Sequence, residues 1–194
     1  MRIFIALDID ENIRSRIEVF MQGVSGFAPD ARWVRIASLH VTLKFIGNQS
    51  AEEVEDIKQA LARIPVGAIE ISVRGYGFFP TPKAPRVFWI GVEAGPQLAA
   101  LAKSVDEATA ALGIPKEEHA FSPHLSLARR GGSVAPRGRK GDAPNHTFLQ
   151  LQKRLATMPV PEFGTMTARE FSLYESQLGR GGSRYTKIVR FELT

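Results

Sequence analysis

The sequence contains no cysteine and no long apolar run. The absence of cysteine excludes a disulfide scaffold, a thiolate metal site and a cysteine nucleophile, and it fits a reducing compartment. No stretch is apolar over the length that a bilayer requires, and the five apolar residues before Asp8 are too few for a signal peptide. We therefore expect a soluble, cytoplasmic protein that does not associate with a membrane.

The composition is otherwise that of an ordinary globular protein. Hydrophobic residues make up 44% of the 194 residues and charged residues 23%, which excludes disordered and collagen-like architectures. A chain of this length can bury a core without disulfides or bound metals. The sequence is therefore expected to fold on its own.

The positive net charge of +5 is concentrated in two segments. Residues 129–140 include five basic residues and no acidic one, and residues 180–190 include four more, again without an acid. Clustered basic residues on glycine-rich segments suit a polyanion such as a nucleic acid, and they equally suit a solvated loop. Charge alone therefore leaves both interpretations open.

Periodicity predicts alternating strands and helices with no long linker between them. Strands are expected at residues 2–8, 32–36, 39–46, 69–79, 86–93, 122–128, 166–175 and 185–193. Helices are expected after Asp10, after Ser50, over residues 96–112 and after Asn145. The second helix carries the strongest local signal, because Ser50 and Glu53 have the spacing of a capping box.

One separation recurs along the chain. Residues 2–5 resemble residues 86–89, and residues 40–43 resemble residues 124–127, each pair being 84 residues apart. Two strands that recur at one offset indicate a single domain, residues 1–194, made of two intertwined pseudo-repeats. The alternative is a coincidence between hydrophobic strands. With a duplication, two pseudo-symmetric lobes would face a shared cleft.

The recurring strands carry the pattern His-x-(Thr or Ser)-Leu, which includes two of the four histidines. In a strand, residues two apart point to the same face, so His40 shares a face with Thr42, and His124 with Ser126. The intervening apolar residues point to the opposite face and pack in the lobe. Each lobe would therefore present one imidazole beside one hydroxyl to the cleft.

Two imidazoles and two hydroxyls suit phosphoryl displacement. This reaction requires a base to activate the attacking oxygen and an acid to protonate the leaving oxygen, and histidine titrates near neutrality. Hydroxyls and nearby cations would hold the non-bridging oxygens. Buried structural histidines are one alternative. A metal site built from both histidines and an acid is another, although metal ligation does not require the repeated hydroxyl.

Four segments resemble the RNA 2′,3′-cyclic phosphodiesterase (2′-5′ RNA ligase) branch of the 2H phosphoesterase superfamily. These are residues 32–34, 39–47, 121–129 and 172–176, followed by Gly182 and Tyr185. The resemblance implies an α+β fold with two lobes, each a mostly antiparallel sheet backed by helices, around a central groove. It implies hydrolysis of a 2′,3′-cyclic phosphate to a 2′-phosphomonoester without a metal or other cofactor, and a reverse reaction that forms a 2′-5′ bond.

Within this chemistry we assign His40 as the proton donor to the leaving 3′ oxygen and His124 as the proton acceptor that activates water. Pseudo-symmetry makes the reverse order nearly as plausible. Thr42 and Ser126 would bind the phosphate oxygens. Arg129 would add positive charge, although its odd offset from His124 brings it to the same face only if the strand ends or bulges there.

The remaining candidates have weaker signals. Phe121, three residues before a motif histidine, would stack a base of the substrate. Trp33 and Phe78 are alternatives for the same role, although aromatic residues more often belong to the core. His119 and His146 are expected at the surface.

The expected partner is RNA with a 2′,3′-cyclic phosphate end, tRNA halves included, and we expect a monomer without an obligate protein partner. One rival function is hydrolysis of a small cyclic nucleotide such as ADP-ribose cyclic phosphate. A second rival is an RNA-binding module without catalytic activity, which the two intact motifs disfavour.

Overall fold

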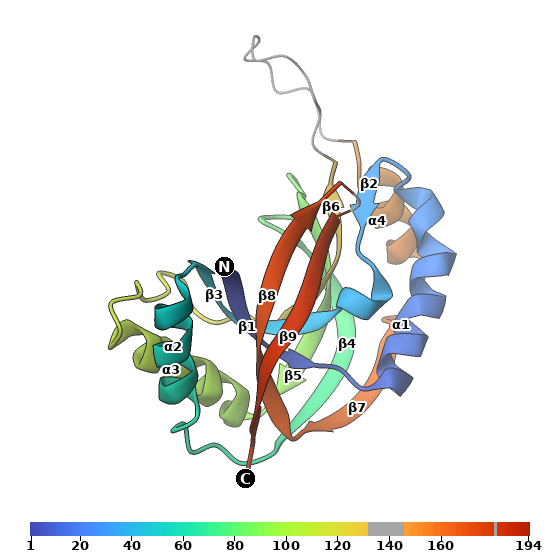
Figure 1. Cartoon of the computed structure of the whole chain (residues 1–194). Coiled ribbons are helices and arrows are strands. Elements are labelled where there is room, and N and C mark those ends of the chain that lie inside the picture. Colours follow the sequence, from blue (N-terminus) through green and yellow to red (C-terminus); the bar gives the residue numbers. More distant parts are fainter. Residues whose placement is uncertain (132–145, 181) are drawn as a thin grey trace.

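The computed structural model describes residues 1–131, 146–180 and 182–194, and it contains two antiparallel sheets (Figure 1). The four-stranded sheet has the order β3 (His40–Asn48), β1 (Arg2–Asp8), β8 (Glu170–Gly179), β9 (Gly182–Glu192). The five-stranded sheet has the order β2 (Ala31–Trp33), β6 (His124–Arg130), β5 (Val87–Ala94), β4 (Ile69–Phe79), β7 (Glu162–Ala168). The expected α+β fold is confirmed.

The described helices lie in two groups on opposite sides of the molecule (Figure 1). They are α1 (Glu11–Val24), α2 (Ala51–Leu61), α3 (Pro96–Ala110) and α4 (Leu149–Ala156). Although α1 follows a strand of the four-stranded sheet, it contacts β7 of the five-stranded sheet. Conversely, α3 follows β5 and contacts β3 and α2. The chain therefore crosses between the two lobes after each of these strands.

Local sequence signals account for the first two helices. α1 buries Ile13, Ile17, Met21 and Val24, which recur at helical spacing and form one stripe. At the start of α2, the Glu53 amide donates to Ser50 Oγ (3.2 Å) and the Ser50 amide donates to Glu53 Oε2 (2.7 Å). The predicted capping box is therefore present, and it satisfies two amide groups that the first turn leaves free.

A single hydrophobic cluster joins both sheets and the helices that cover them. A second, small cluster of Phe4, Ala6 and Tyr174, with Tyr185 packed against it, lies on the other face of the four-stranded sheet. Alternation along β1 explains the two clusters, because Ile3, Ile5 and Leu7 belong to the large one. The small cluster therefore marks the sheet face that is turned away from the main core.

The prediction of one strand over residues 166–175 is wrong, because the chain passes from one sheet to the other at Arg169. β7 ends at Ala168 and pairs with β4, whereas β8 begins at Glu170 and pairs with β1 and β9. Buried residues continue on both sides of the break, so the hydrophobic pattern alone predicts one continuous strand. The Arg169 carbonyl accepts a hydrogen bond from the Leu193 amide (2.8 Å).

Smaller differences concern element ends. The expected strand at residues 32–36 stops at Trp33 and is followed by a 3₁₀ turn at Ile36–Ser38, whose amide bonds are local rather than between strands. The strand expected at residues 122–128 runs over His124–Arg130, because the amides up to Arg130 still pair with neighbouring strands. The expected cap Asn145 and most of the basic segment 129–140 lie outside the described residues.

None of the helices in the described ranges combines the length and the apolar character needed to cross a membrane.

Candidate active site

The two motif histidines are the first residues of paired strands, one in each sheet. β3 pairs with β1 so that Asp8 lies opposite His40, and β6 pairs with β5 so that Gly91 lies opposite His124. The next residue in each motif, Val41 or Leu125, is completely buried. The alternation predicted for each motif is therefore the one that the strands adopt.

A β-bulge follows the motif serine in β6. Ser126 lies opposite Trp89 of β5, and Ala128 lies opposite the adjacent residue, Phe88. Leu127 therefore has no partner in β5 and is an inserted residue. Leu127 and Ala128 are both buried, and the alternation is reversed beyond them. Arg129 therefore lies on the same face as His124. The odd offset between the two residues allows this only because the strand bulges between them.

An equivalent bulge occurs in β3. Its register against β1 steps from Thr42 to Lys44, so Leu43 is inserted, and Leu43 and Lys44 are both buried. The following residue, Phe45, is 60% exposed. Phe45 precedes Arg129 by the same 84 residues that separate the motifs. One lobe thus presents an exposed aromatic ring where the other presents a guanidinium.

These strand ends surround a pocket of about 110 Å³. Its lining residues are Val34, Ser38, Leu39, His40, Thr42, Phe45, His124, Ser126, Arg129 and Tyr185. The structure therefore brings together His40, His124, Thr42 and Ser126 from the two sheets, as the sequence pattern predicted. Arg129, which alternation alone placed on the opposite face, joins them because of the bulge. Tyr185 reaches the pocket from β9.

Both imidazoles are held by a backbone carbonyl two residues earlier in the chain. His40 Nδ1 lies 2.7 Å from the Ser38 carbonyl oxygen, and His124 Nδ1 lies 2.7 Å from that of Ser122. A carbonyl oxygen can only accept, so Nδ1 carries the hydrogen in both rings. Nε2 is then the nitrogen that gains or loses a proton, and both rings share one tautomer.

The surroundings of His40 are aromatic and acidic. Phe4 lies 4.8 Å and Tyr185 lies 5.1 Å from the imidazole, measured between ring centroids. Tyr174 stacks nearby at 6.1 Å, and its hydroxyl donates to Asp8 Oδ1. Lys187 Nζ donates to the other oxygen of Asp8 (2.6 Å). Burial opposes ionisation of Asp8, but these two hydrogen bonds keep its pKa below the ordinary value.

The surroundings of His124 are aromatic and basic. Phe79 meets its ring edge-to-face at 4.9 Å, and Trp89 lies at 6.1 Å. The charge that acts on this imidazole is that of Arg129. The two histidines thus share their backbone setting and differ in the sign of the neighbouring charge.

Burial lowers the pKa of both imidazoles, and the backbone carbonyl beside each ring opposes this effect. At His40, Asp8 also raises the pKa, while Arg14 lowers it. At His124, Arg129 lowers the pKa further. The pKa of each imidazole lies below its ordinary value on balance. Local charge distinguishes the two rings, because Asp8 opposes this lowering at His40 whereas Arg129 adds to it at His124.

Several predicted residues lie elsewhere. Phe121 is half-buried against the main core and is not among the lining residues of the pocket. Trp33 donates its indole N–H to the Ala28 carbonyl (3.0 Å), and Phe78 is buried. Phe78 is therefore a core residue, and Trp33 packs half-buried against the core. His119 and His146 are exposed, as expected.

Sequence reasoning did not single out several residues around the two imidazoles. They are Asp8, Phe79, Trp89, Tyr174 and Lys187. Phe45 differs from these, because its match to Arg129 at the repeat offset is visible in the sequence. The others come from strands without the motif, and only the sheet order brings them to the histidines.

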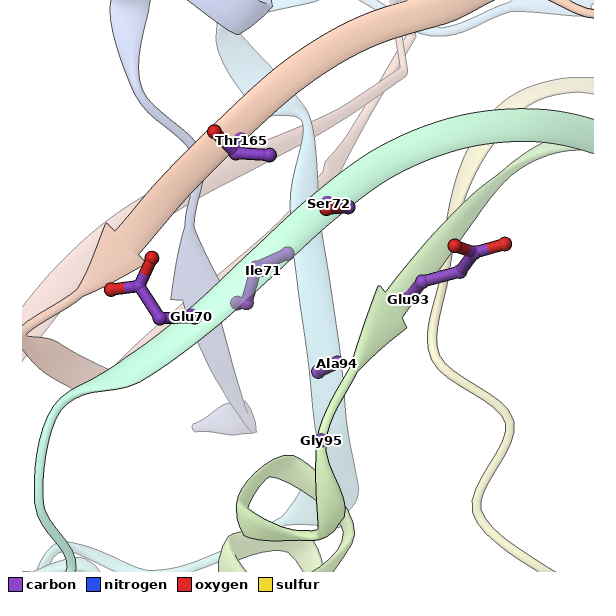
Figure 2. Close-up of a pocket in the computed structure, with 7 residues that line it drawn as sticks. All are labelled: Glu70, Ile71, Ser72, Glu93, Ala94, Gly95 and Thr165. Carbon is purple, nitrogen blue, oxygen red and sulfur yellow. The ribbon is translucent and has the colours of Figure 1, made fainter.

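A second pocket, of about 380 Å³, lies over β4, β5 and β7 (Figure 2). Glu70 and Glu93 contribute carboxylates to it, with hydroxyls from Ser72 and Thr165. The two carboxylates make this pocket unfavourable for a phosphate. The described residues contain no group of three or more His, Asp or Glu side chains that could hold a metal ion.

Known proteins are similar to this chain over its whole length. The profile of the family described as LigT like Phosphoesterase matches the chain twice, at residues 7–89 and 90–185. A protein of Archaeoglobus fulgidus named RNA 2′,3′-cyclic phosphodiesterase is 32% identical over 99% of this chain and its own full length. One of the same name from Escherichia coli is 29% identical over 100% of this chain and 97% of its own.

The crystal structure of Escherichia coli LigT complexed with 3′-AMP has the same fold. It superposes with a TM-score of 0.78 at 28% identity, covering 100% of this chain and 98% of that one. The chain belongs to the LigT-like phosphoesterase family.

Proposed function

We propose that this protein hydrolyses 2′,3′-cyclic phosphate ends of RNA to 2′-phosphomonoesters. The observation that carries the proposal is the single pocket lined by two imidazoles of the same tautomer, each with a hydroxyl two residues further along its strand. The full-length similarity to phosphodiesterases of this name supports the same activity. Such a pocket supplies an acid, a base and oxyanion ligands around one phosphorus atom.

The reaction follows from these groups. His124 Nε2 accepts a proton from water while the water oxygen forms a bond to phosphorus. The bond between phosphorus and O3′ breaks, and His40 Nε2 donates its proton to O3′, which leaves a 3′-hydroxyl and a 2′-phosphomonoester. Thr42 and Ser126 donate hydrogen bonds to the non-bridging oxygens, and Arg129 offsets their negative charge.

The local charges support this order of roles. A proton donor must start cationic, and Asp8 favours that state at His40. A proton acceptor must start neutral, and Arg129 favours that state at His124. The opposite order would place each imidazole in the charge state that its neighbour disfavours.

We favour RNA ends over a small cyclic nucleotide as the substrate, because the similar proteins are named RNA 2′,3′-cyclic phosphodiesterases. Within this class we propose tRNA halves as substrates, and ligation through a 2′-5′ bond as the reverse reaction. A cytoplasmic location and a monomeric state remain predictions of the sequence.

We also propose that the chain is one domain of two intertwined pseudo-repeats. Equivalent bulges 84 residues apart and the two successive matches of one family profile support this duplication. The crossing of α1 and α3 to the opposite lobes is consistent with it.

Hydrolysis of an oligoribonucleotide with a 2′,3′-cyclic end, measured in EDTA, tests the proposal. We expect His40→Ala and His124→Ala each to lose roughly 10³-fold in rate, the range for loss of a general acid or base. The exposed His119→Ala serves as the matched control and should retain wild-type activity. Equal rates in all four proteins would refute the catalytic role, and inactivation by EDTA would refute metal independence.

A further inference from the structure

A larger cavity adjoins the histidine pocket. It measures about 390 Å³, compared with about 110 Å³ for the pocket itself, and the two share Phe45, Arg129 and Tyr185 as lining residues. Its other lining residues are Arg2, Ile3, Phe4, Gly47, Ser176 and Ser183. A volume of this size lies within the range of small-molecule sites, roughly 300–1,000 Å³. The catalytic groove therefore continues beyond the reacting phosphate.

The polar groups of this cavity are suited to an anion. Its lining residues include two arginines, Arg2 and Arg129, and two serines, Ser176 and Ser183, which come from four different strands. Within the described ranges, neither of these arginines takes part in an ion pair. A guanidinium without an acidic partner presents planar paired donors that match two oxygens of a phosphate.

A nucleoside 2′,3′-cyclic phosphate alone carries one phosphate, which the histidine pocket binds. A second basic site in the same groove is suited to a second phosphate in the substrate. In RNA this is the phosphodiester on the 5′ side of the terminal nucleoside. A substrate that extends from the histidine pocket along β5 would meet an acidic surface. Glu93 lies on the same face of β5 as Gly91, the partner of His124, and Glu93 lines the acidic pocket of Figure 2.

We propose that the cavity beside the histidine pocket binds the phosphodiester that precedes the terminal nucleoside, with Arg2 as its principal ligand. This inference rests on the proposed function and specifies its substrate, because it makes an oligonucleotide end a better substrate than a mononucleotide. Ser176 and Ser183 donate hydrogen bonds to the same phosphate. Arg129 lies at the junction between the two cavities.

Steady-state kinetics on cytidine 2′,3′-cyclic phosphate and on the dinucleotide CpC with a 2′,3′-cyclic end test this assignment. We expect Arg2→Ala to lower kcat/KM for the dinucleotide about tenfold, mainly through KM, as for loss of one charged hydrogen bond. The value for the mononucleotide should stay within about twofold, because that substrate does not reach Arg2. Arg63→Ala, an exposed arginine outside both cavities, is the matched control.

Salt dependence gives a second readout. The slope of log(kcat/KM) against log[salt] for the dinucleotide should become shallower by about one in Arg2→Ala and remain unchanged in Arg63→Ala. Equal losses on both substrates, or no loss on the dinucleotide, would overturn the assignment while leaving the hydrolytic function intact. If wild-type protein hydrolyses neither substrate, the proposed function itself fails.

ADP-ribose cyclic phosphate also carries further phosphates, so it forms a third arm of the experiment. An Arg2-dependent preference for this compound without one for the dinucleotide would overturn the RNA phosphodiester as the ligand. An Arg2 effect confined to the dinucleotide supports it.

Discussion

The two sides of the histidine pocket have the same backbone and opposite electrostatics. On each side an imidazole is held by a carbonyl two residues earlier, a hydroxyl follows two residues later, and a bulge then turns one further residue toward the pocket. The Asp8 carboxylate acts on one imidazole and the Arg129 guanidinium on the other. The comparison teaches that strands with the same motif supply the same geometry, whereas residues that differ between the two sides would, in our proposal, distinguish the acid from the base.

The largest expected effect concerns what the two sides share. If both imidazoles act on one phosphorus atom, the double variant His40→Ala/His124→Ala should be little slower than either single variant. Single-turnover rates on a cyclic-ended oligonucleotide measure this. Losses that multiply would indicate independent contributions and break the pairing of the two sides.

A second difference between the sides is the residue after each bulge, Lys44 in one and Ala128 in the other. Lys44 is buried, and its ammonium donates to Asp106 (2.5 Å) and to the Pro115 carbonyl (2.9 Å). Lys44→Ala leaves these acceptors without their donor, and we expect it to reduce the free energy of unfolding by about 3 kcal/mol.

Denaturant titration measures this loss. The control is Lys58→Ala, which removes a partly exposed ion pair with Glu55 and should cost roughly 0.5 kcal/mol or less. Similar losses of unfolding free energy in the two variants would mean that the contact of Lys44 with Asp106 of α3 does not stabilise the fold more than an exposed ion pair does.

The hydroxyls should behave alike on the two sides. Thr42→Val and Ser126→Ala each remove one hydrogen bond to a charged oxygen with little change in shape, and we expect about a tenfold loss in kcat/KM. Steady-state kinetics on one cyclic-ended substrate compares them. A loss in only one variant would show that the phosphate is held from one side.

The site features that the sequence predicted are those encoded within a few residues. Alternation in a strand is local, so His40, Thr42, His124 and Ser126 could be assigned to shared faces without knowledge of the fold. The bulges at Leu43 and Leu127 could not, because neither position carries a glycine or other local signal of an inserted residue.

Contacts between strands that are distant in the sequence could not be predicted either. Asp8 meets Tyr174 and Lys187 only because β1, β8 and β9 are neighbours in one sheet, across more than 160 residues of sequence. The expected single strand at residues 166–175 failed for a related reason. A hydrophobic pattern records burial, and both β7 and β8 are buried, but it does not record which sheet a strand joins.

Neutralising the charge beside each histidine should move the two limbs of the pH profile in opposite directions. A cationic donor is lost as pH rises through its pKa, so His40 sets the alkaline limb. A neutral acceptor is lost as pH falls through its pKa, so His124 sets the acid limb. Arg129→Gln removes a charge that lowers the pKa of His124, and it should move the acid limb to higher pH.

The most direct test is the pH dependence of kcat/KM for Asp8→Asn, with the exposed Glu192→Gln as control. Asp8 raises the pKa of His40, so its neutralisation should shift the alkaline limb to lower pH, leave the acid limb in place and narrow the bell. A shift of the acid limb to lower pH, which would widen the bell, would make His40 the base and contradict the assignment of roles.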